Sequence, residues 1–223
     1  MNHKAFIAEF IGTFALVFIG VGAITGNFYN GGQTGLVGIA LAHGLTIACM
    51  VTATLATSGG HLNPAVTIGL FTAKKINGIN TVSYVIAQCL GAIVATFVIQ
   101  LCYPTEARYL ASRGTPSLAQ GINLGMGLIT EIVLTFFLVF VVYATAVDKR
   151  APKMGGLFIG LTVTFDILAG GPVTGACMNP ARYLGPALLS GQLDHFWLYW
   201  LGPILGGILA ATGYKLILEE KIL

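Results

Sequence analysis

The chain has 223 residues, of which 56% are hydrophobic and only 9% are charged, and its mean hydropathy is +0.84. Soluble domains carry about 25% charged residues, so eleven basic and eight acidic side chains are too few to cover a soluble surface of this size. The composition therefore predicts a protein embedded in a lipid bilayer. It argues against a disordered chain, a coiled coil and a nucleic-acid partner.

The cysteines stand singly in or beside apolar stretches, at Cys49, Cys89, Cys102 and Cys177. No C-x-x-C spacing joins them, which argues against a metal site or a disulfide framework. We therefore expect them to be small packing residues, and we expect neither a metal nor a cofactor.

Six apolar segments are long enough, or nearly so, to cross the hydrocarbon core, which takes about 20 helical residues. They cover residues 5–24, 35–57, 79–101, 122–146, 154–169 and 196–217. The first is too long for a signal peptide, contains Glu9 and lacks an Ala-x-Ala cleavage site, so we expect it to be retained. The segments predict an all-α membrane protein with six transmembrane helices.

The basic residues outside these segments indicate the orientation. One side of the membrane would carry Lys4, Lys74, Lys75, Lys149, Arg150, Lys153, Lys215 and Lys221, and the other only Arg108 and Arg113. Loops rich in Lys and Arg remain on the cytoplasmic side. We therefore expect a multi-pass protein with both termini in the cytoplasm.

The two halves of the chain repeat one another. Glu9 and Thr13 return as Glu131 and Thr135 at an offset of 122, within a longer match between the first and fourth segments. The triplet Asn63-Pro64-Ala65 returns as Asn179-Pro180-Ala181 at an offset of 116. Four residues of the third segment return in the sixth at an offset of 115: Tyr84, Gly91, Ile93 and Ala95 match Tyr199, Gly206, Ile208 and Ala210. Three matches in the same order indicate a duplicated chain.

Each half holds three spans, so the second half must enter the membrane from the opposite face. This makes the repeat an inverted one, with a pseudo-twofold axis in the membrane plane. We expect a single channel-like domain over residues 1–223. Repeat 1 would cover about 1–102 and repeat 2 about 122–223, and the polar stretch 103–121 would be an extracellular linker between them.

Each Asn-Pro-Ala triplet follows a glycine-containing stretch, 58–62 or 170–175, and precedes an apolar run of about ten residues, too short to span. Asn is a preferred N-cap and Pro is favoured at the first helical position, so Asn63-Pro64 and Asn179-Pro180 each predict a helix start. We therefore expect two re-entrant half-helices that meet near the midplane, N-terminus to N-terminus. The alternative is that the asparagines only cap buried helices.

Two converging helix N-termini would repel cations from the midplane, since each carries about half a positive charge. A central water could accept hydrogen bonds from both asparagine amides, which would interrupt a continuous proton wire. The loop carbonyls before each helix would be free to accept hydrogen bonds from a file of small polar molecules. The carbonyls expected to do so belong to Gly60, His61, Leu62, Gly175, Ala176 and Cys177.

The chain resembles the aquaporins, or major intrinsic proteins, over its whole length. The residues that carry the resemblance are 58–67, Met178-Asn179-Pro180-Ala181-Arg182, Ala8-Glu9-Phe10 and Tyr199-Trp200. The resemblance implies a passive channel for water and small neutral solutes that excludes protons and ions, and not an enzyme. It also implies a homotetramer with one pore in each subunit, and we expect it in the plasma membrane.

The family has a second constriction on the extracellular side, and the matching positions here are His43, Ile167, Ala176 and Arg182. As a pore residue Arg182 would offer fixed donors to the solute and a barrier to cations. The alternative for Arg182 is a snorkelling or paired arginine, and for His43 a hydrogen-bonded histidine between helices.

This ring resembles that of the plant tonoplast-type and ammonia-permeable relatives, so ammonia and hydrogen peroxide are expected to pass with water. A glycerol or small-solute facilitator is the alternative. Tyr183 stands where water channels usually have Ser and glycerol facilitators Asp, whereas Ala187 and the pair Tyr199-Trp200 match the water-channel pattern. His43 and Tyr183 argue against glycerol.

Three acids lie inside spans, and intramembrane acids are candidates for function. A proton-coupled transporter using Glu9, Glu131 or Asp166 is therefore the alternative from a different class. The matching positions of Glu9 and Glu131 favour a structural role instead, in which each accepts hydrogen bonds from a re-entrant loop. Asp166 has no counterpart in the other half.

Overall fold

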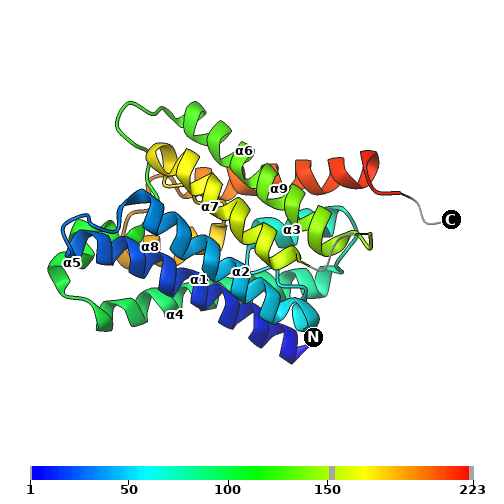
Figure 1. Cartoon of the computed structure of the whole chain (residues 1–223), viewed down its shortest axis with the longest axis horizontal. Helices are drawn as coiled ribbons and strands as arrows, with labels where there is room; N and C mark the ends of the chain where they lie inside the picture. The colour runs from blue at the N-terminus through cyan, green and yellow to red at the C-terminus, as the bar shows by residue number, and fades with distance from the viewer. Residues whose placement is uncertain (1, 151–153, 221–223) are drawn as a thin grey trace.

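Long helices lie side by side in one bundle, and both chain ends emerge at the same end of it (Figure 1). The computed structural model describes residues 2–150 and 154–220, and these residues form helices and loops without a strand. The six helices long and apolar enough to cross a membrane are α1 (His3–Tyr29), α2 (Gly35–Ser58), α4 (Gly78–Cys102), α6 (Leu124–Val142), α7 (Gly155–Thr174) and α9 (Phe196–Ile217). The π-helical turn η2 (Tyr143–Val147) extends α6. The six predicted spans are confirmed.

Two short helices stand between the long ones, as the triplets predict. Helix α3 (Pro64–Thr72) has nine residues and α8 (Pro180–Ser190) has eleven, so neither is long enough to cross a bilayer. Each packs against the last span of the other half, α3 on α9 and α8 on α4. Gly69 and Gly207 let the backbones of α3 and α9 meet, because a Cβ on Gly69 would lie 2.6 Å from the Gly207 carbonyl oxygen.

The second half repeats the contacts of the first. Gly91 of α4 lies against the Phe10 carbonyl of α1, and Gly206 of α9 lies in the same way against the Ile132 carbonyl of α6. In each case a side chain at the glycine would overlap that carbonyl, so these crossings need glycine. Figure 1 shows α1 and α6 running in opposite directions. The two halves are therefore inverted copies, as predicted.

The glycine-containing stretch before the second triplet is more helical than expected. Helix α7 continues past the predicted end at residue 169 to Thr174, and only Gly175 leaves it, at φ 78°. The Gly175 N–H donates to the Gly171 carbonyl at 3.0 Å, which closes the last turn. Pro172 sits within this turn, where it removes only one helical hydrogen bond.

The predicted linker is not an irregular loop throughout. It contains helix α5 (Thr105–Leu110) and the 3₁₀ turn η1 (Ser112–Gly114). Ser112, Arg113 and Gly114 have φ values of 46°, 51° and 73°, a left-handed run that turns the chain back onto the bundle. A Cβ on Gly114 would lie 2.7 Å from Cγ1 of Val21, so this close approach to α1 requires glycine.

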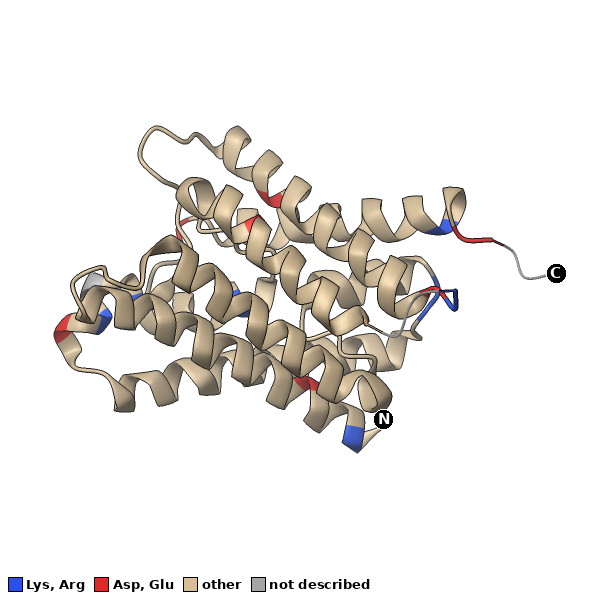
Figure 2. Cartoon of the chain, viewed as in Figure 1, with Lys and Arg blue, Asp and Glu red and all other residues tan. Residues whose placement is uncertain are grey.

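Most charged residues lie at the two ends of the bundle (Figure 2). At the end that carries both termini, Lys75 pairs with Glu219 at 2.5 Å and Arg150 pairs with Asp148 at 2.6 Å. The Arg150 guanidinium holds the pKa of the Asp148 carboxyl well below its usual range. Lys153 and Lys221, which the sequence assigns to the same side, lie outside the described residues.

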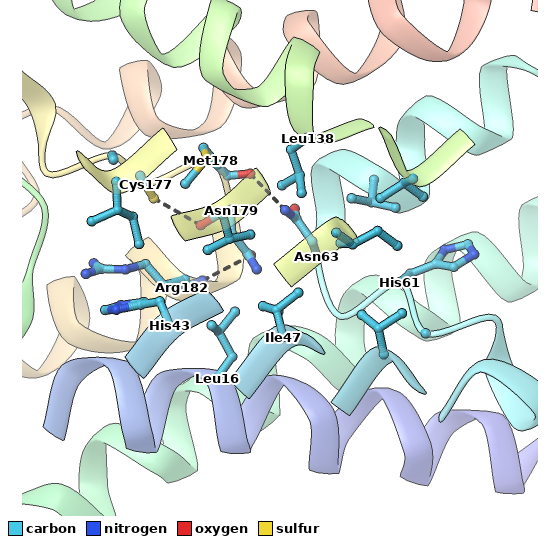
Figure 3. Close-up of a pocket in the computed structure, with 18 residues that line it drawn as sticks. Leu16, His43, Ile47, His61, Asn63, Leu138, Cys177, Met178, Asn179 and Arg182 are labelled. Carbon is cyan, nitrogen blue, oxygen red and sulfur yellow. Dashed lines mark hydrogen bonds between the residues drawn. The ribbon is translucent and has the colours of Figure 1, made fainter. Parts of the chain in front are cut away.

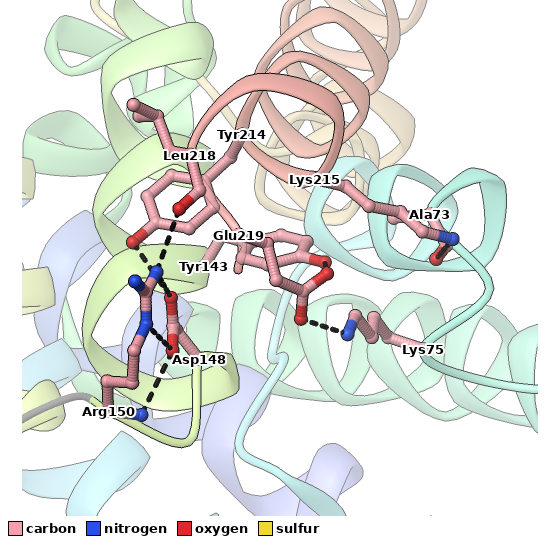
Figure 4. Close-up of polar contacts among 9 residues, drawn as sticks. All are labelled: Ala73, Lys75, Tyr143, Asp148, Arg150, Tyr214, Lys215, Leu218 and Glu219. Atoms are coloured by element: carbon pink, nitrogen blue, oxygen red, sulfur yellow. Dashed lines mark hydrogen bonds and ion pairs between the residues drawn. The ribbon is translucent and has the colours of Figure 1, made fainter. Parts of the chain in front are cut away.

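These pairs tie the chain after α9 to the rest of the bundle (Figure 4). The Tyr143 hydroxyl donates to Glu219 at 2.8 Å, and the Arg150 guanidinium donates to the Leu218 carbonyl at 2.8 Å. Lys215 donates to the Ala73 carbonyl at the end of α3 at 2.6 Å. The segment after α9 is therefore held against the rest of the bundle at this end.

Candidate functional site

A small cavity lies at the centre of the bundle, between the two half-helices (Figure 3). Its wall is mostly apolar and comes from α1, α2, α6 and α7, from the two half-helices and from the loops before them. Its volume is about 30 Å³. Roughly 10–15 Å³ is enough to hold one water, so the cavity suits a few small molecules and not a wide aqueous pore.

The first loop is held by the buried carboxylate of Glu9. One oxygen accepts from the Ser58 hydroxyl at 2.6 Å and the His61 N–H at 2.9 Å. The other accepts from the Leu62 N–H at 2.6 Å and the Gln88 amide at 2.7 Å. Glu9 is fully buried, so these four donors take the place of water around it.

Glu131 holds the second loop in the same way. It accepts from the Thr174 hydroxyl at 2.6 Å, the Cys177 N–H at 2.9 Å and the Met178 N–H at 2.8 Å. Within the described residues it has no fourth donor to match Gln88. Neither glutamate lies on the cavity wall. Both therefore contact the loops and do not line the cavity.

The two asparagines cap the half-helices. The Asn63 side-chain oxygen accepts from the Ala65 N–H at 2.8 Å. The Asn179 oxygen accepts from the N–H groups of Ala181 and Arg182 at 3.0 and 3.2 Å. Both N-termini open onto the same cavity (Figure 3).

The asparagine amides also join the two loops, which the sequence did not reveal. The Asn63 amide donates to the Met178 carbonyl at 2.8 Å, and the Asn179 amide donates to the Leu62 carbonyl at 2.9 Å. Each amide has two N–H groups, so one remains for a molecule in the cavity. The interpretation of the asparagines as caps alone is therefore incomplete, because each also holds the opposite loop.

Four of the six residues predicted to supply the carbonyl file line the cavity. Gly60, His61, Ala176 and Cys177 line the cavity, but Leu62 and Gly175 do not. The Leu62 carbonyl points at Asn179 instead, because the cross-link between the loops uses it. Of each triplet only the asparagine reaches the wall, and Pro64, Ala65, Pro180 and Ala181 pack behind it.

All four residues of the expected ring, His43, Ile167, Ala176 and Arg182, lie on the cavity wall. Arg182 is buried, and its guanidinium donates to the Gly114 carbonyl of the linker at 2.9 Å. No acidic partner is found for it among the described residues. Arg182 is thus fixed by a backbone carbonyl and keeps further N–H donors for a solute.

His43 lies next to Arg182 in the same wall (Figure 3). Its Nδ1 is 2.8 Å from the Ile39 carbonyl oxygen. A carbonyl only accepts, so Nδ1 carries the hydrogen and Nε2 is an acceptor in the neutral ring. Within the described residues, Nε2 is buried and has no hydrogen-bond partner.

Two other predicted residues lie off the wall. Tyr183 is buried behind it, where its ring stacks on Tyr199 with centroids 4.6 Å apart. It therefore gives no direct argument against glycerol. Asp166 is buried beside Ile167 but does not line the cavity, and its Oδ2 has no partner among the described residues.

Cys177 lines the cavity, but its thiol donates to the Asn179 carbonyl at 3.1 Å and only 3% of the residue is exposed. We therefore expect mercurials to inhibit the protein weakly, because the sulfur is turned into the fold. Water flux before and after mercuric chloride measures this. Strong inhibition that disappears in Cys177→Ser would mean that the thiol faces the passage.

Six spans and two half-helices that converge on a narrow passage define a membrane channel. The chain belongs to the major intrinsic protein family, the aquaporins, because the model of that family, "Major intrinsic protein", matches residues 1–214. It is 46% identical to aquaporin TIP4-4 of Zea mays over 220 residues, which are 95% of this chain and 85% of that protein. It is 42% identical to aquaporin TIP2-3 of Arabidopsis thaliana, over 95% of this chain and 86% of that protein.

The fold also matches a solved channel. The aquaglyceroporin from Plasmodium falciparum superposes with a TM-score of 0.86 at 28% identity, over 97% of both chains. Aquaporins pass water and small solutes through membranes and are not enzymes, so the protein is a multi-pass membrane channel. The predicted family and fold class are confirmed.

Proposed function

We propose that the protein conducts water and excludes protons and ions. The observation that carries the proposal is the pair of asparagine amides at the centre of the cavity, each held by the opposite loop. Their free N–H groups would donate to one water, so that its own hydrogens point away from both. A proton could not then hop through the centre, and the two helix N-termini would repel a cation.

The ring of His43, Ile167, Ala176 and Arg182 would form the second barrier. Arg182 carries a full charge in a buried wall and would repel ammonium and other cations. Ammonia and hydrogen peroxide are close to water in size and would use the Arg182 donors and the carbonyls of the loops. We therefore propose that both pass, while Glu9 and Glu131 serve only to hold the loops.

A glycerol facilitator is the second candidate. The mostly apolar wall and the likeness to an aquaglyceroporin favour it. The small volume of the cavity and the imidazole of His43 in its wall argue against it. The similarity to aquaporins of the TIP type supports the water channel over this alternative.

We propose a homotetramer of single-domain subunits, with repeats at about 1–102 and 122–223 and both termini in the cytoplasm. The excess of Lys and Arg at the end that carries the termini supports this orientation. The TIP relatives, which are tonoplast-type aquaporins, point to the tonoplast and not to the plasma membrane expected from the sequence.

Stopped-flow light scattering on proteoliposomes tests the function. We expect osmotic water flux well above that of empty vesicles, with no proton conductance. In Asn179→Asp, a carboxylate would replace the amide that donates to the Leu62 carbonyl and would stand between the two helix N-termini. We expect this variant to lose the proton barrier, seen as a proton current under a pH gradient.

Asn123→Asp is the matched control, because Asn123 caps α6 in an exposed position outside the cavity. It should conduct water and exclude protons like the original protein. A proton conductance in the unmutated protein would refute the proposed mechanism. Glycerol flux as fast as water flux would favour the facilitator.

A further inference from the structure

Gly20 of α1 lies directly behind the imidazole of His43. A Cβ built on Gly20 would lie 2.5 Å from Cδ2 and 2.8 Å from Cε1 of that ring, and closer still to Nε2. Such distances are far below van der Waals contact, so any side chain at position 20 would have to displace His43. Both residues are buried, so the ring fits where a side chain at position 20 would otherwise be.

The inverted repeat shows what the passage looks like without this arrangement. Glu9 of α1 and Glu131 of α6 make equivalent contacts, so the residue numbers of matching positions in these two helices differ by 122. The two glutamates accept from Ser58 of α2 and Thr174 of α7, so matching positions in those helices differ by 116.

By these offsets the counterpart of Gly20 is Val142, and the counterpart of His43 is Ile159. Both counterparts line the cavity, whereas Gly20 has no side chain to do so. At the His43 end of the passage, α1 thus has Gly20 where α6 has Val142 at the other end. The imidazole of His43 occupies the space that a side chain at position 20 would fill.

The His43 ring has little freedom to move elsewhere. Its Nδ1 is bound to the Ile39 carbonyl of its own helix, and helical side chains have few allowed rotamers. A methyl group at position 20 would push the Nε2 edge away from α1. The space on the other side of the ring is the cavity that Arg182 also lines.

We propose that Gly20 determines the specificity of the channel as a positioning residue, because it sets how far His43 projects into the passage. This inference rests on the proposed channel function. Gly20 touches no solute. The ring of four side chains is therefore incomplete as a description of the constriction, since its width at His43 also depends on a residue of α1.

Gly20→Ala tests this in proteoliposomes. We expect its osmotic water permeability to fall on the order of tenfold, with a higher activation energy, because the imidazole narrows the passage. Gly22→Ala is the matched control on the same helix, where a Cβ would have no neighbour closer than 3.9 Å. It should conduct like the unmutated protein.

The double variant Gly20→Ala/His43→Ala separates positioning from helix damage. If Gly20 acts through His43, the double variant should conduct at least as fast as the unmutated protein. It should also match His43→Ala alone in both water and glycerol flux. This rescue is a result that a merely structural role of Gly20 would not give.

Two results would overturn the proposal. In one, Gly20→Ala conducts like Gly22→Ala. In the other, Gly20→Ala is inactive and the double variant stays inactive, which would mean that α1 packing and not His43 is affected. Failure of the proposed function itself is distinct, because the unmutated protein would then show no water flux.

Discussion

Glu131→Ala should abolish water conduction and destabilise the fold more than any surface substitution. The carboxylate is the acceptor for the Thr174 hydroxyl and for the Cys177 and Met178 N–H groups, all of which are buried. A buried donor left unpaired costs about 1–3 kcal/mol, so the loss of three acceptor contacts is large against the stability of a folded domain. The midpoint of thermal unfolding in detergent measures the effect.

Two further variants serve as comparisons for this prediction. Glu106→Ala removes an exposed glutamate on α5 and should leave both the midpoint and the flux unchanged. Glu131→Gln keeps one acceptor oxygen but turns an NH₂ group toward the loop donors, so it should fall between the two alanine variants. If Glu131→Ala conducts water with an unchanged midpoint, the second loop does not depend on this carboxylate.

Arg182→Val should have the largest effect on selectivity. By the offset of 116, its counterpart in the other half is Val66, which also lines the cavity, so the variant makes the two ends of the passage more alike. Loss of the guanidinium removes a bulky group and a positive barrier. We expect glycerol permeability to rise by at least about tenfold, the change produced by roughly 1.4 kcal/mol of barrier, with water flux largely retained.

Arg108→Val is the control for charge alone, since Arg108 lies in the linker and does not line the cavity. It should leave glycerol permeability low. Stopped-flow measurements with water and glycerol gradients on all three proteins decide the result. Equal glycerol flux in Arg182→Val and the unmutated protein would show that Arg182 does not limit the width.

The sequence predicted those parts of the fold that local signals specify. Continuous apolar runs marked the spans, because a bilayer demands about 20 apolar residues in each. The pairs Asn63-Pro64 and Asn179-Pro180 predicted the half-helices, because capping and the fixed φ of proline act within one turn.

Features that depend on distant residues could not be predicted. The bonds from Asn63 to Met178 and from Asn179 to Leu62 join residues more than a hundred positions apart, and no residue type marks them. Leu62 and Met178 also have positive φ values, 51° and 53°, which neither side chain favours. The position of Gly20 behind His43 was missed for the same reason, since a glycine in an apolar helix gives no sign of what it faces.

The same long-range packing also fixes the order in which the passage is assembled during synthesis. Helix α3 rests on α9, which is translated after the other described helices, whereas α8 finds α4 already made. A nascent chain that stops before α9 therefore leaves one face of α3 uncovered, at the point where Gly69 later meets the Gly207 backbone. Because chains are made from the N-terminus onward, the half-helix that is translated first has to wait longer for its packing partner, and the passage is complete only when α9 is in place.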